Sequence, residues 1–182
     1  MPSAWGFESL LGYHFLKESF MNGFEIHFDM DGVHADFELA IEEVAGKPIS
    51  ELTKDEIYSI SDTEGFFSNL QVMVGSKELL AFAAEHGFTM FINSSVGTRN
   101  PERVEKEKRE FLDLRCKGCH FEDKYFVTTS KDKGLYAHEK AILVDARQKC
   151  VDAFEAAGGI AILHVDHEST IAKIKEIVGL ED

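Results

Sequence analysis

The sequence predicts an α/β fold with a three-layer, Rossmann-like parallel sheet, and two observations lead to this prediction. Short apolar runs rich in β-forming residues alternate with longer stretches of helical period, and the connections between them are short. This alternation favours parallel strands with helices on both faces of the sheet. The runs expected to be strands are residues 24–28, 88–92, 124–128, 141–144 and 160–164.

Helical segments lie between and after these strands. Residues 101–114 place Val104, Phe111 and Leu112 amid charge, and we expect the charged run 103–110 to be a solvated helix face with ion pairs. Residues 147–159 end in two glycines, which stop a helix. A last helix, with a stripe of isoleucines, is predicted at residues 168–179.

The interval between the first strand and the next core helix is too long for a plain crossover. It contains helical patterns, a Gly-Lys-Pro turn and an aromatic cluster, so we expect a small α-helical cap inserted at residues 34–75. Residues 23–33 and 76–182 then form the core, and residues 1–22 form an N-terminal arm to which the sequence assigns no role.

Composition excludes several classes of function. Of the 182 residues 44% are hydrophobic, which excludes general disorder, and the formal charge of −14 makes binding of a nucleic-acid polymer unlikely because like charges repel. No apolar run is long enough to cross a membrane, and the start of the chain lacks a secretory signal. Three cysteines argue against a disulfide framework, so we expect a cytoplasmic protein.

Acidic residues follow the first predicted strand. Asp29 and Asp31 stand one residue apart, and Gly32 lets the backbone turn away after them. Two carboxylates this close repel each other, and a divalent cation commonly relieves that repulsion. The carboxyl ends of parallel strands are also where ligands bind in α/β sheets. A solvated Asp-rich turn is the alternative interpretation.

The ends of three other predicted strands strengthen the functional interpretation. Ser94 and Ser95 follow the second strand, and their hydroxyl groups suit phosphate oxygens. Lys131 and Lys133 follow the third strand and provide positive charge, and Asp145 ends the fourth. We expect these groups to project from one edge of the sheet.

In this order the elements resemble the haloacid dehalogenase-like (HAD) superfamily of phosphohydrolases, and more specifically the 5′(3′)-deoxyribonucleotidase family and its bacterial and phage relatives. The resemblance begins at residue 24 and is carried by these stretches: DMDGVHADFE (29–38), EGFFSNLQVMVGSKELL (64–80), INSSVG (92–97), SKDKGLYA (130–137) and ILVDARQKCVDAFEAAGGIAILH (142–164). It implies a HAD-like core and a Mg²⁺-dependent phosphomonoesterase that acts through an aspartyl-phosphate. The implied substrate is a nucleoside monophosphate or another small phosphorylated metabolite.

The resemblance also implies roles for individual catalytic residues. Asp29 matches the nucleophile, and Asp31 matches the general acid and then base. Ser94 matches the hydroxyl that binds the phosphoryl group, with Ser95 as its alternative, and Lys133 matches the lysine that neutralises phosphoryl oxygens and nucleophile.

Further matches concern the substrate and the metal. Lys131 matches a second basic residue for the substrate, and Phe37 and Phe66, next to Phe67, match cap aromatics that flank a base. The ligands implied for Mg²⁺ are Asp29, the backbone carbonyl of Asp31, and Asp145.

One residue departs from the family pattern. Relatives commonly have Asp-Asp-Arg at the fourth motif, whereas this chain has Asp145, Ala146 and Arg147. The missing acid is a metal ligand in the nucleotidase branch, so the alternative function is a catalytically weakened binding or regulatory protein. We expect the binding partner to be a small phosphorylated molecule. The sequence leaves open whether the chain forms a homodimer.

Two other signals leave alternatives open. Cys116, Cys119 and His120 match the C-x-x-C-H pattern of haem attachment, which we discount, while a zinc or redox role for the pair is a minor alternative. His34 is either a substrate contact or a residue of the cap hinge.

Overall fold

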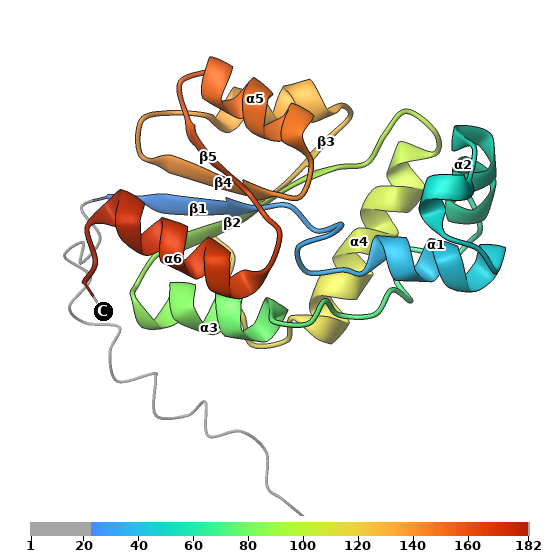
Figure 1. The fold of residues 1–182 in the computed structure, drawn as a ribbon, viewed down its shortest axis with the longest axis horizontal. Helices are drawn as coiled ribbons and strands as arrows, with labels where there is room; N and C mark the ends of the chain where they lie inside the picture. Colours follow the sequence, from blue (N-terminus) through green and yellow to red (C-terminus); the bar gives the residue numbers. More distant parts are fainter. Residues whose placement is uncertain (1–22, 182) are drawn as a thin grey trace, which may run out of the picture.

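A five-stranded parallel sheet forms the centre of the molecule in the computed structural model, which describes residues 23–181 (Figure 1). The strand order is β3-β2-β1-β4-β5, so the first strand lies in the middle with a strand on each side. The strands are β1 (Glu25–Phe28), β2 (Thr89–Ser95), β3 (Asp123–Val127), β4 (Ala141–Asp145) and β5 (Ile160–Leu163). The predicted fold class is therefore confirmed; the predicted arm at residues 1–22 lies outside the described residues.

The second strand is longer than the sequence pattern predicts. Its apolar run ends at Ile92, but β2 continues to Ser95 because Ser94 and Ser95 pair with Phe126 and Val127 of β3. Ser94 is thus held in the sheet itself rather than in the loop after it. A seven-residue strand with polar residues at its end carries its side chains directly to the edge of the sheet.

Helices cover both faces of the sheet, as alternation along the strands requires. On β4, Ile142 and Val144 belong to the main hydrophobic core, whereas Ala141 and Leu143 pack on the opposite face. The main core lies against α3 (Ser76–Glu85), α4 (Pro101–Arg115) and α6 (His167–Val178). The opposite face is covered by α5 (Gln148–Ala156), next to the short 3₁₀ helix η3 (Ser130–Tyr136).

A smaller helical unit follows β1. It comprises α1 (Phe37–Ala45), the 3₁₀ helix η2 (Ile49–Glu51) and α2 (Lys54–Ser61), and it lies beyond the carboxyl ends of the strands (Figure 1). The start of each α-helix is capped: Asp36 accepts from the Leu39 N–H, and Thr53 forms a capping box with Glu56. All three helices fall within the range predicted for the cap.

Two linkers join the cap to the core side by side. Ala35 and Val72 form an antiparallel bridge, and the Asp36 N–H donates to the Gln71 carbonyl at 2.8 Å. The cap therefore enters and leaves the core at one place, next to the end of β1.

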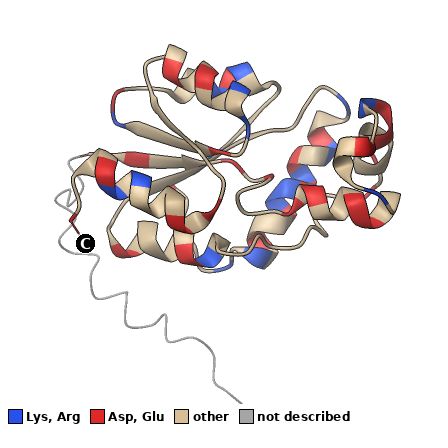
Figure 2. Cartoon of the chain, in the orientation of Figure 1, with Lys and Arg blue, Asp and Glu red and all other residues tan. Residues whose placement is uncertain are grey.

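Charge is distributed unevenly over these elements. Acidic and basic residues gather on the helices and are sparse on the strands, and acidic residues stand in the loop that follows β1 (Figure 2). Between residues 23 and 181, none of the helices is long and apolar enough to cross a lipid bilayer.

Candidate functional site

The acidic loop after β1 starts inside the sheet. The Asp29 N–H donates to the Val144 carbonyl at 2.9 Å, which continues the pairing of β1 with β4 by one residue. The Asp29 side chain is 1% exposed. The chain then turns at Gly32, whose φ is +79° and where a Cβ would lie 2.8 Å from the Ala146 Cβ. Only glycine fits this turn without strain.

Lys133 lies between two buried carboxylates. Its Nζ is 3.0 Å from Asp29 Oδ1 and 2.5 Å from Asp145 Oδ2, and all three side chains are buried. η3 carries this lysine, and Asn93 of β2 anchors η3 by donating from Nδ2 to the Lys133 carbonyl at 3.2 Å. The sequence prediction that Asp29, Lys133 and Asp145 share one neighbourhood is supported by this geometry.

Opposing effects determine the ionisation of this trio. Burial alone would raise the pKa of Asp29, but Lys133, Lys108 and Arg147 hold it below its usual value, so Asp29 is a carboxylate. Burial and the charge of Asp29 raise the pKa of Asp145. Burial opposes the charge of Lys133, yet the two acids raise its pKa and keep it an ammonium.

A second lysine, which the sequence pattern did not single out, completes the site. Lys108 Nζ donates to Asp31 Oδ2 at 2.8 Å, to Ser94 Oγ at 2.9 Å and to the Ser95 carbonyl at 3.0 Å. This lysine is 1% exposed on α4, so the prediction of a solvated face over 103–110 is wrong for Lys108 and its neighbour Glu107. The ion pairs expected along that run are present, for example between Arg103 and Glu107.

A signal for Lys108 was present in the helical period. Lys108 follows Val104 by four residues and precedes Phe111 and Leu112 by three and four, which places it on the apolar stripe of α4. A lysine on a buried stripe next to a sheet edge needs acidic or polar partners, and Asp31 and Ser94 are those partners.

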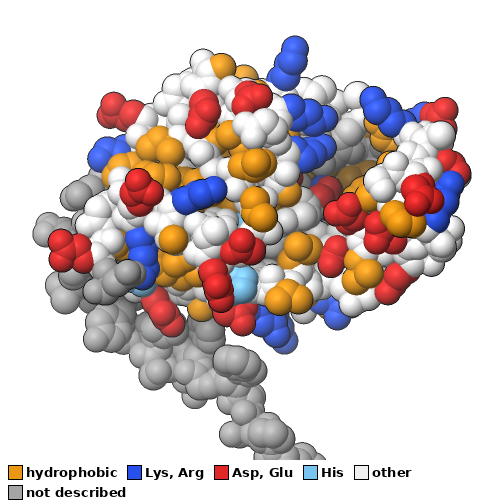
Figure 3. All heavy atoms as spheres, in the orientation of Figure 1, with side chains coloured by type: hydrophobic (Ala, Val, Ile, Leu, Met, Phe, Trp, Pro, Cys, Tyr) orange, Lys and Arg blue, Asp and Glu red, His pale blue; other side chains and the backbone are white. Residues whose placement is uncertain are grey.

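Aromatic rings of the cap border these lysines. Phe37, Phe66 and Phe67 form one cluster, with ring centroids 5.1–6.1 Å apart. The Lys108 ammonium lies 5.3 Å from the centroid of the Phe67 ring. The structure thus brings the predicted cap aromatics next to the polar groups of the sheet edge. Figure 3 shows the surface of the molecule hollowed between the core and the cap.

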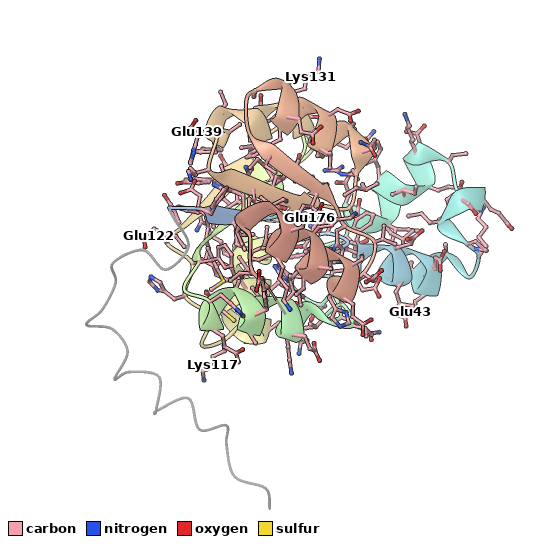
Figure 4. All side chains as sticks on the ribbon, turned by 60° about the vertical axis from the view of Figure 1, so that its left-hand side comes forward. Glu43, Lys117, Glu122, Lys131, Glu139 and Glu176 are labelled. Carbon is pink, nitrogen blue, oxygen red and sulfur yellow. The ribbon has the colours of Figure 1, made fainter. Side chains whose placement is uncertain are left out.

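Two predicted site residues do not present their side chains to this contact network. The Ser95 hydroxyl donates to the Thr128 carbonyl at 3.2 Å, so Ser94 and not Ser95 presents its hydroxyl to Lys108. Lys131 is exposed and points outward from the molecule (Figure 4). A role for Lys131 in binding substrate stays a prediction.

Arg147 adds a third cation that the sequence analysis quoted but did not assign. Although burial opposes its charge, the nearby Asp29, Asp145 and Asp31 raise its pKa. Three carboxylates therefore face three cations at this edge of the sheet. These cations offset the negative charge of a strongly acidic chain locally, at this edge of the sheet.

The donors fit one weakly held Mg²⁺. Asp29 Oδ2 is buried and has no hydrogen-bond partner, and a free carboxylate oxygen is a donor that this ion prefers. Asp145 differs, because Oδ2 contacts Lys133 and Oδ1 accepts from the Arg147 N–H at 2.9 Å. Within residues 23–181 no three His, Cys, Asp or Glu side chains come together as a ready ligand cluster. Asp29 and the backbone carbonyl of Asp31 would hold the ion, while the carboxyl oxygen Oδ1 of Asp31, which has no hydrogen-bond partner, stays free.

His34 belongs to the cap hinge. It is fully buried, and its Nδ1 lies 2.9 Å from the Ser76 hydroxyl at the start of α3. Burial lowers the pKa of His34 to about 3, so this histidine is neutral. Its backbone carbonyl accepts from the Met73 N–H, which ties together the two linkers of the cap. Of the two alternatives for His34, these contacts favour the hinge.

The cysteine pair lies at the far end of α4. The Cys119 N–H donates to the Cys116 carbonyl in a turn, and both thiols are free. Burial raises the pKa of Cys116 to about 12, and burial also raises the pKa of Cys119. The His120 ring is exposed and pairs with Glu122 rather than with a thiol. High thiol pKa values disfavour thiolate chemistry near neutral pH, so these residues remain outside the site.

Solved structures with a similar fold include several hydrolases. A HAD-superfamily hydrolase from Ehrlichia chaffeensis aligns with a TM-score of 0.55 at 12% identity, over 85% of this chain and 97% of that one. A hydrolase from Streptococcus pneumoniae TIGR4 aligns with a TM-score of 0.53 at 13% identity, over 87% of this chain and 100% of that one. A HAD hydrolase from Bacillus subtilis, described as bound to magnesium, aligns with a TM-score of 0.50 at 11% identity, over 85% of this chain and 98% of that one.

Sequence comparison adds no closer relationship, because no protein-family model and no curated protein matches this chain. At identities this low, structural likeness shows the fold alone. The chain therefore has the α/β Rossmann-like fold of these HAD hydrolases: a five-stranded parallel sheet with flanking helices.

Proposed function

We propose that this chain is a Mg²⁺-dependent phosphomonoesterase of the HAD type that acts through an aspartyl-phosphate on Asp29. One observation carries the proposal: two buried lysines, Lys133 and Lys108, hold the nucleophile, the general acid and a serine hydroxyl together at the carboxyl edge of the sheet. Phosphoryl transfer depends mainly on positioning and on neutralising negative charge, and this arrangement provides both. The likeness in fold to HAD hydrolases supports the same class of reaction.

Each step of the reaction is assigned to a residue of this chain. The Asp29 carboxylate attacks phosphorus, the bond from phosphorus to the ester oxygen breaks, and Asp31 gives its proton to the leaving alkoxide. Asp31 then takes a proton from water, which attacks the aspartyl-phosphate, releases phosphate and restores Asp29. Lys133 and Lys108 neutralise the charge that develops on the phosphoryl oxygens, and Ser94 donates a hydrogen bond to them. Mg²⁺, when bound, supplies further charge neutralisation as a Lewis acid.

A nucleoside monophosphate is the substrate that the cap supports best. The partly exposed rings of Phe37 and Phe66 offer an apolar, stackable surface, and both pack on the buried Phe67 ring that borders Lys108. Base–aromatic stacking is a common way to hold a nucleobase. The resemblance of the acidic loop and the later motifs to deoxyribonucleotidases supports the same substrate class.

A weakened binding or regulatory protein is the second candidate, and Ala146 favours it. The Ala146 Cβ packs against Gly32, so position 146 faces the turn that carries Asp31. A carboxylate at this position would reach the metal-binding edge, and alanine offers no oxygen there. Since Asp145 is already engaged by Lys133 and the Arg147 N–H, the missing acid lowers the expected affinity for Mg²⁺.

Release of inorganic phosphate tests the leading proposal. Purified protein in excess Mg²⁺ is given a panel of ribo- and deoxyribonucleoside monophosphates and sugar phosphates. We expect turnover of at least one nucleotide and a loss of at least about a thousandfold in Asp29→Asn, which keeps the shape of the side chain but removes the nucleophile. Asp152→Asn, on the exposed face of α5, is the matched control and is expected to retain full activity. Absence of phosphate release from the whole panel, or activity retained in Asp29→Asn, refutes the proposal.

The variant Ala146→Asp separates the two candidates. If the native chain is an enzyme limited by its metal site, the added carboxylate raises both the turnover rate and the affinity for Mg²⁺, each by about tenfold or more. A chain that stays inactive in saturating Mg²⁺ with Asp at position 146 supports the binding-protein candidate. Titration of Mg²⁺ against activity and by calorimetry measures the two effects separately.

A further inference from the structure

A buried carboxylate of the core holds the segment of the cap that carries the aromatic cluster. Glu107 of α4 is 4% exposed, and its two oxygens accept from the backbone N–H groups of Gly65 and Phe67 at 2.9 and 3.0 Å. Hydrogen bonds to a charged, buried acceptor are stronger than those between neutral groups. This one side chain therefore fixes the backbone on both sides of Phe66.

A neighbouring arginine extends the same attachment. Arg103 Nη1 donates to Glu107 Oε1 at 2.8 Å and to the Thr63 carbonyl at 2.9 Å, and its Nη2 donates to the Ser61 carbonyl at 3.2 Å. The residues from 62 to 69 form turns without regular secondary structure. The segment has only turn hydrogen bonds of its own, so the bonds from Glu107 and Arg103 add a direct attachment of its backbone to α4.

The next residue of α4, Lys108, reaches the side chains proposed to bind the phosphoryl group. These side chains, called the phosphoryl site, are Asp29, Asp31, Ser94, Lys108 and Lys133. Lys108 contacts Asp31 and Ser94, and its ammonium lies 5.3 Å from the Phe67 ring centroid. Glu107 and Lys108 are adjacent on a rigid helix of 15 residues, so α4 sets the separation between the aromatic cluster and the phosphoryl site.

We infer that Glu107 is a positioning residue for substrate specificity: by holding the backbone on both sides of Phe66, it places the partly exposed Phe66 ring over the buried Phe67 ring that borders Lys108, where it can stack on the base of a nucleoside monophosphate. This inference rests on the proposed function and adds the residue that determines its substrate class. Glu107 itself contacts neither substrate nor reacting atoms. A merely structural role would lower activity on every phosphate ester alike, whereas the positioning role affects only substrates that carry a base.

The variant Glu107→Gln tests the inference, because an NH₂ group replaces one carboxylate oxygen and cannot accept a hydrogen bond from a backbone N–H. Two substrates are compared: deoxythymidine 5′-monophosphate and ribose 5-phosphate, which has no base. We expect kcat/KM to fall about tenfold for the nucleotide, through KM, and less than about twofold for the sugar phosphate. The matched control is Glu105→Gln on the exposed face of the same helix, where the carboxylate pairs with Arg109, and no change is expected.

Amide hydrogen exchange gives a readout that needs no turnover. The N–H groups of Gly65 and Phe67 are expected to exchange about tenfold faster in Glu107→Gln than in the native chain. Binding of deoxythymidine 5′-monophosphate, measured by equilibrium dialysis, is expected to weaken about tenfold. If the native chain binds the nucleotide but releases no phosphate, the proposed function is refuted. The inference about Glu107 is then still decided by comparing the nucleotide dissociation constants of the native chain and of Glu107→Gln.

Three results overturn the inference. They are equal losses on both substrates, unchanged exchange at Gly65 and Phe67, and unchanged nucleotide affinity in Glu107→Gln. If Glu107→Gln does not fold, Arg103→Gln replaces it, because it removes the bonds to Thr63 and Ser61 and leaves the carboxylate in place. This second variant must show the same discrimination between the two substrates, and its absence overturns the inference as well.

Discussion

Replacing Lys133 by methionine tests the electrostatic basis of the site. The substitution keeps the length of the side chain but removes the cation between Asp29 and Asp145, which are 1% and 0% exposed. Removing one partner of a buried ion pair costs about 3–5 kcal/mol, because the remaining charge is left uncompensated. With a urea m-value of about 2 kcal/mol per molar, the unfolding midpoint falls by about 2 M.

The sign of the pH dependence distinguishes this cause from a packing defect. In the native chain the pKa of Asp29 lies below its unfolded value, so its stabilising contribution is present above that unfolded pKa and is lost as the pH falls through the folded one. In the variant, burial and mutual repulsion raise the folded pKa values of both acids. Stability is then lost as the pH rises, so the deficit is largest at about pH 7 and shrinks toward about pH 5.

Urea unfolding followed by far-ultraviolet circular dichroism measures both effects. The control is Lys131→Met, which removes an exposed lysine of the same 3₁₀ helix and is expected to change the free energy of unfolding by less than about 0.5 kcal/mol. Adding Asp145→Asn to Lys133→Met is expected to restore part of the loss by removing one unpaired acid. A deficit below about 1 kcal/mol, or one that is equal at both pH values, would falsify the electrostatic reasoning.

Two further predictions concern the cap hinge. Gly75 has a φ of +83°, and a Cβ there would lie 1.8 Å from His167 Nδ1; Gly75→Ala should therefore lower the free energy of thermal unfolding by about 2 kcal/mol or more. Gly87→Ala, with a φ of +72° but open space around the Cβ, should cost only the strain of about 1 kcal/mol, and equal losses would contradict the steric argument. Because the folded pKa of His34 is about 3 and its ordinary value is 6.5, protonation favours the unfolded chain. Below pH 6.5 the native chain should therefore lose up to about 1.4 kcal/mol of unfolding free energy per pH unit because of this residue. In His34→Gln the unfolding free energy, measured by urea titration at several pH values, should fall less steeply with decreasing pH. An equally steep fall in the variant would contradict the prediction.

The pattern of residues along the chain was enough to predict the sheet and the position of its acidic edge. Five apolar runs separated by helical periods leave few alternatives to a parallel sheet, and the ends of such strands lie along one edge. The sequence could therefore place four side chains together, because each stands at or after the end of a strand and strand direction determines that position. These are Asp29, Ser94, Lys133 and Asp145.

The other side chains of the site depend on how the helices dock on the sheet. Lys108 and Glu107 lie in a run of alternating charge whose local pattern is that of a solvated helix face, and only the docking of α4 against the cap and the sheet edge buries them. The choice of Ser94 over Ser95 likewise followed from the register of β2 with β3. Local periodicity records which residues share a face, but it does not record what that face meets, and a buried charge is defined by its partners.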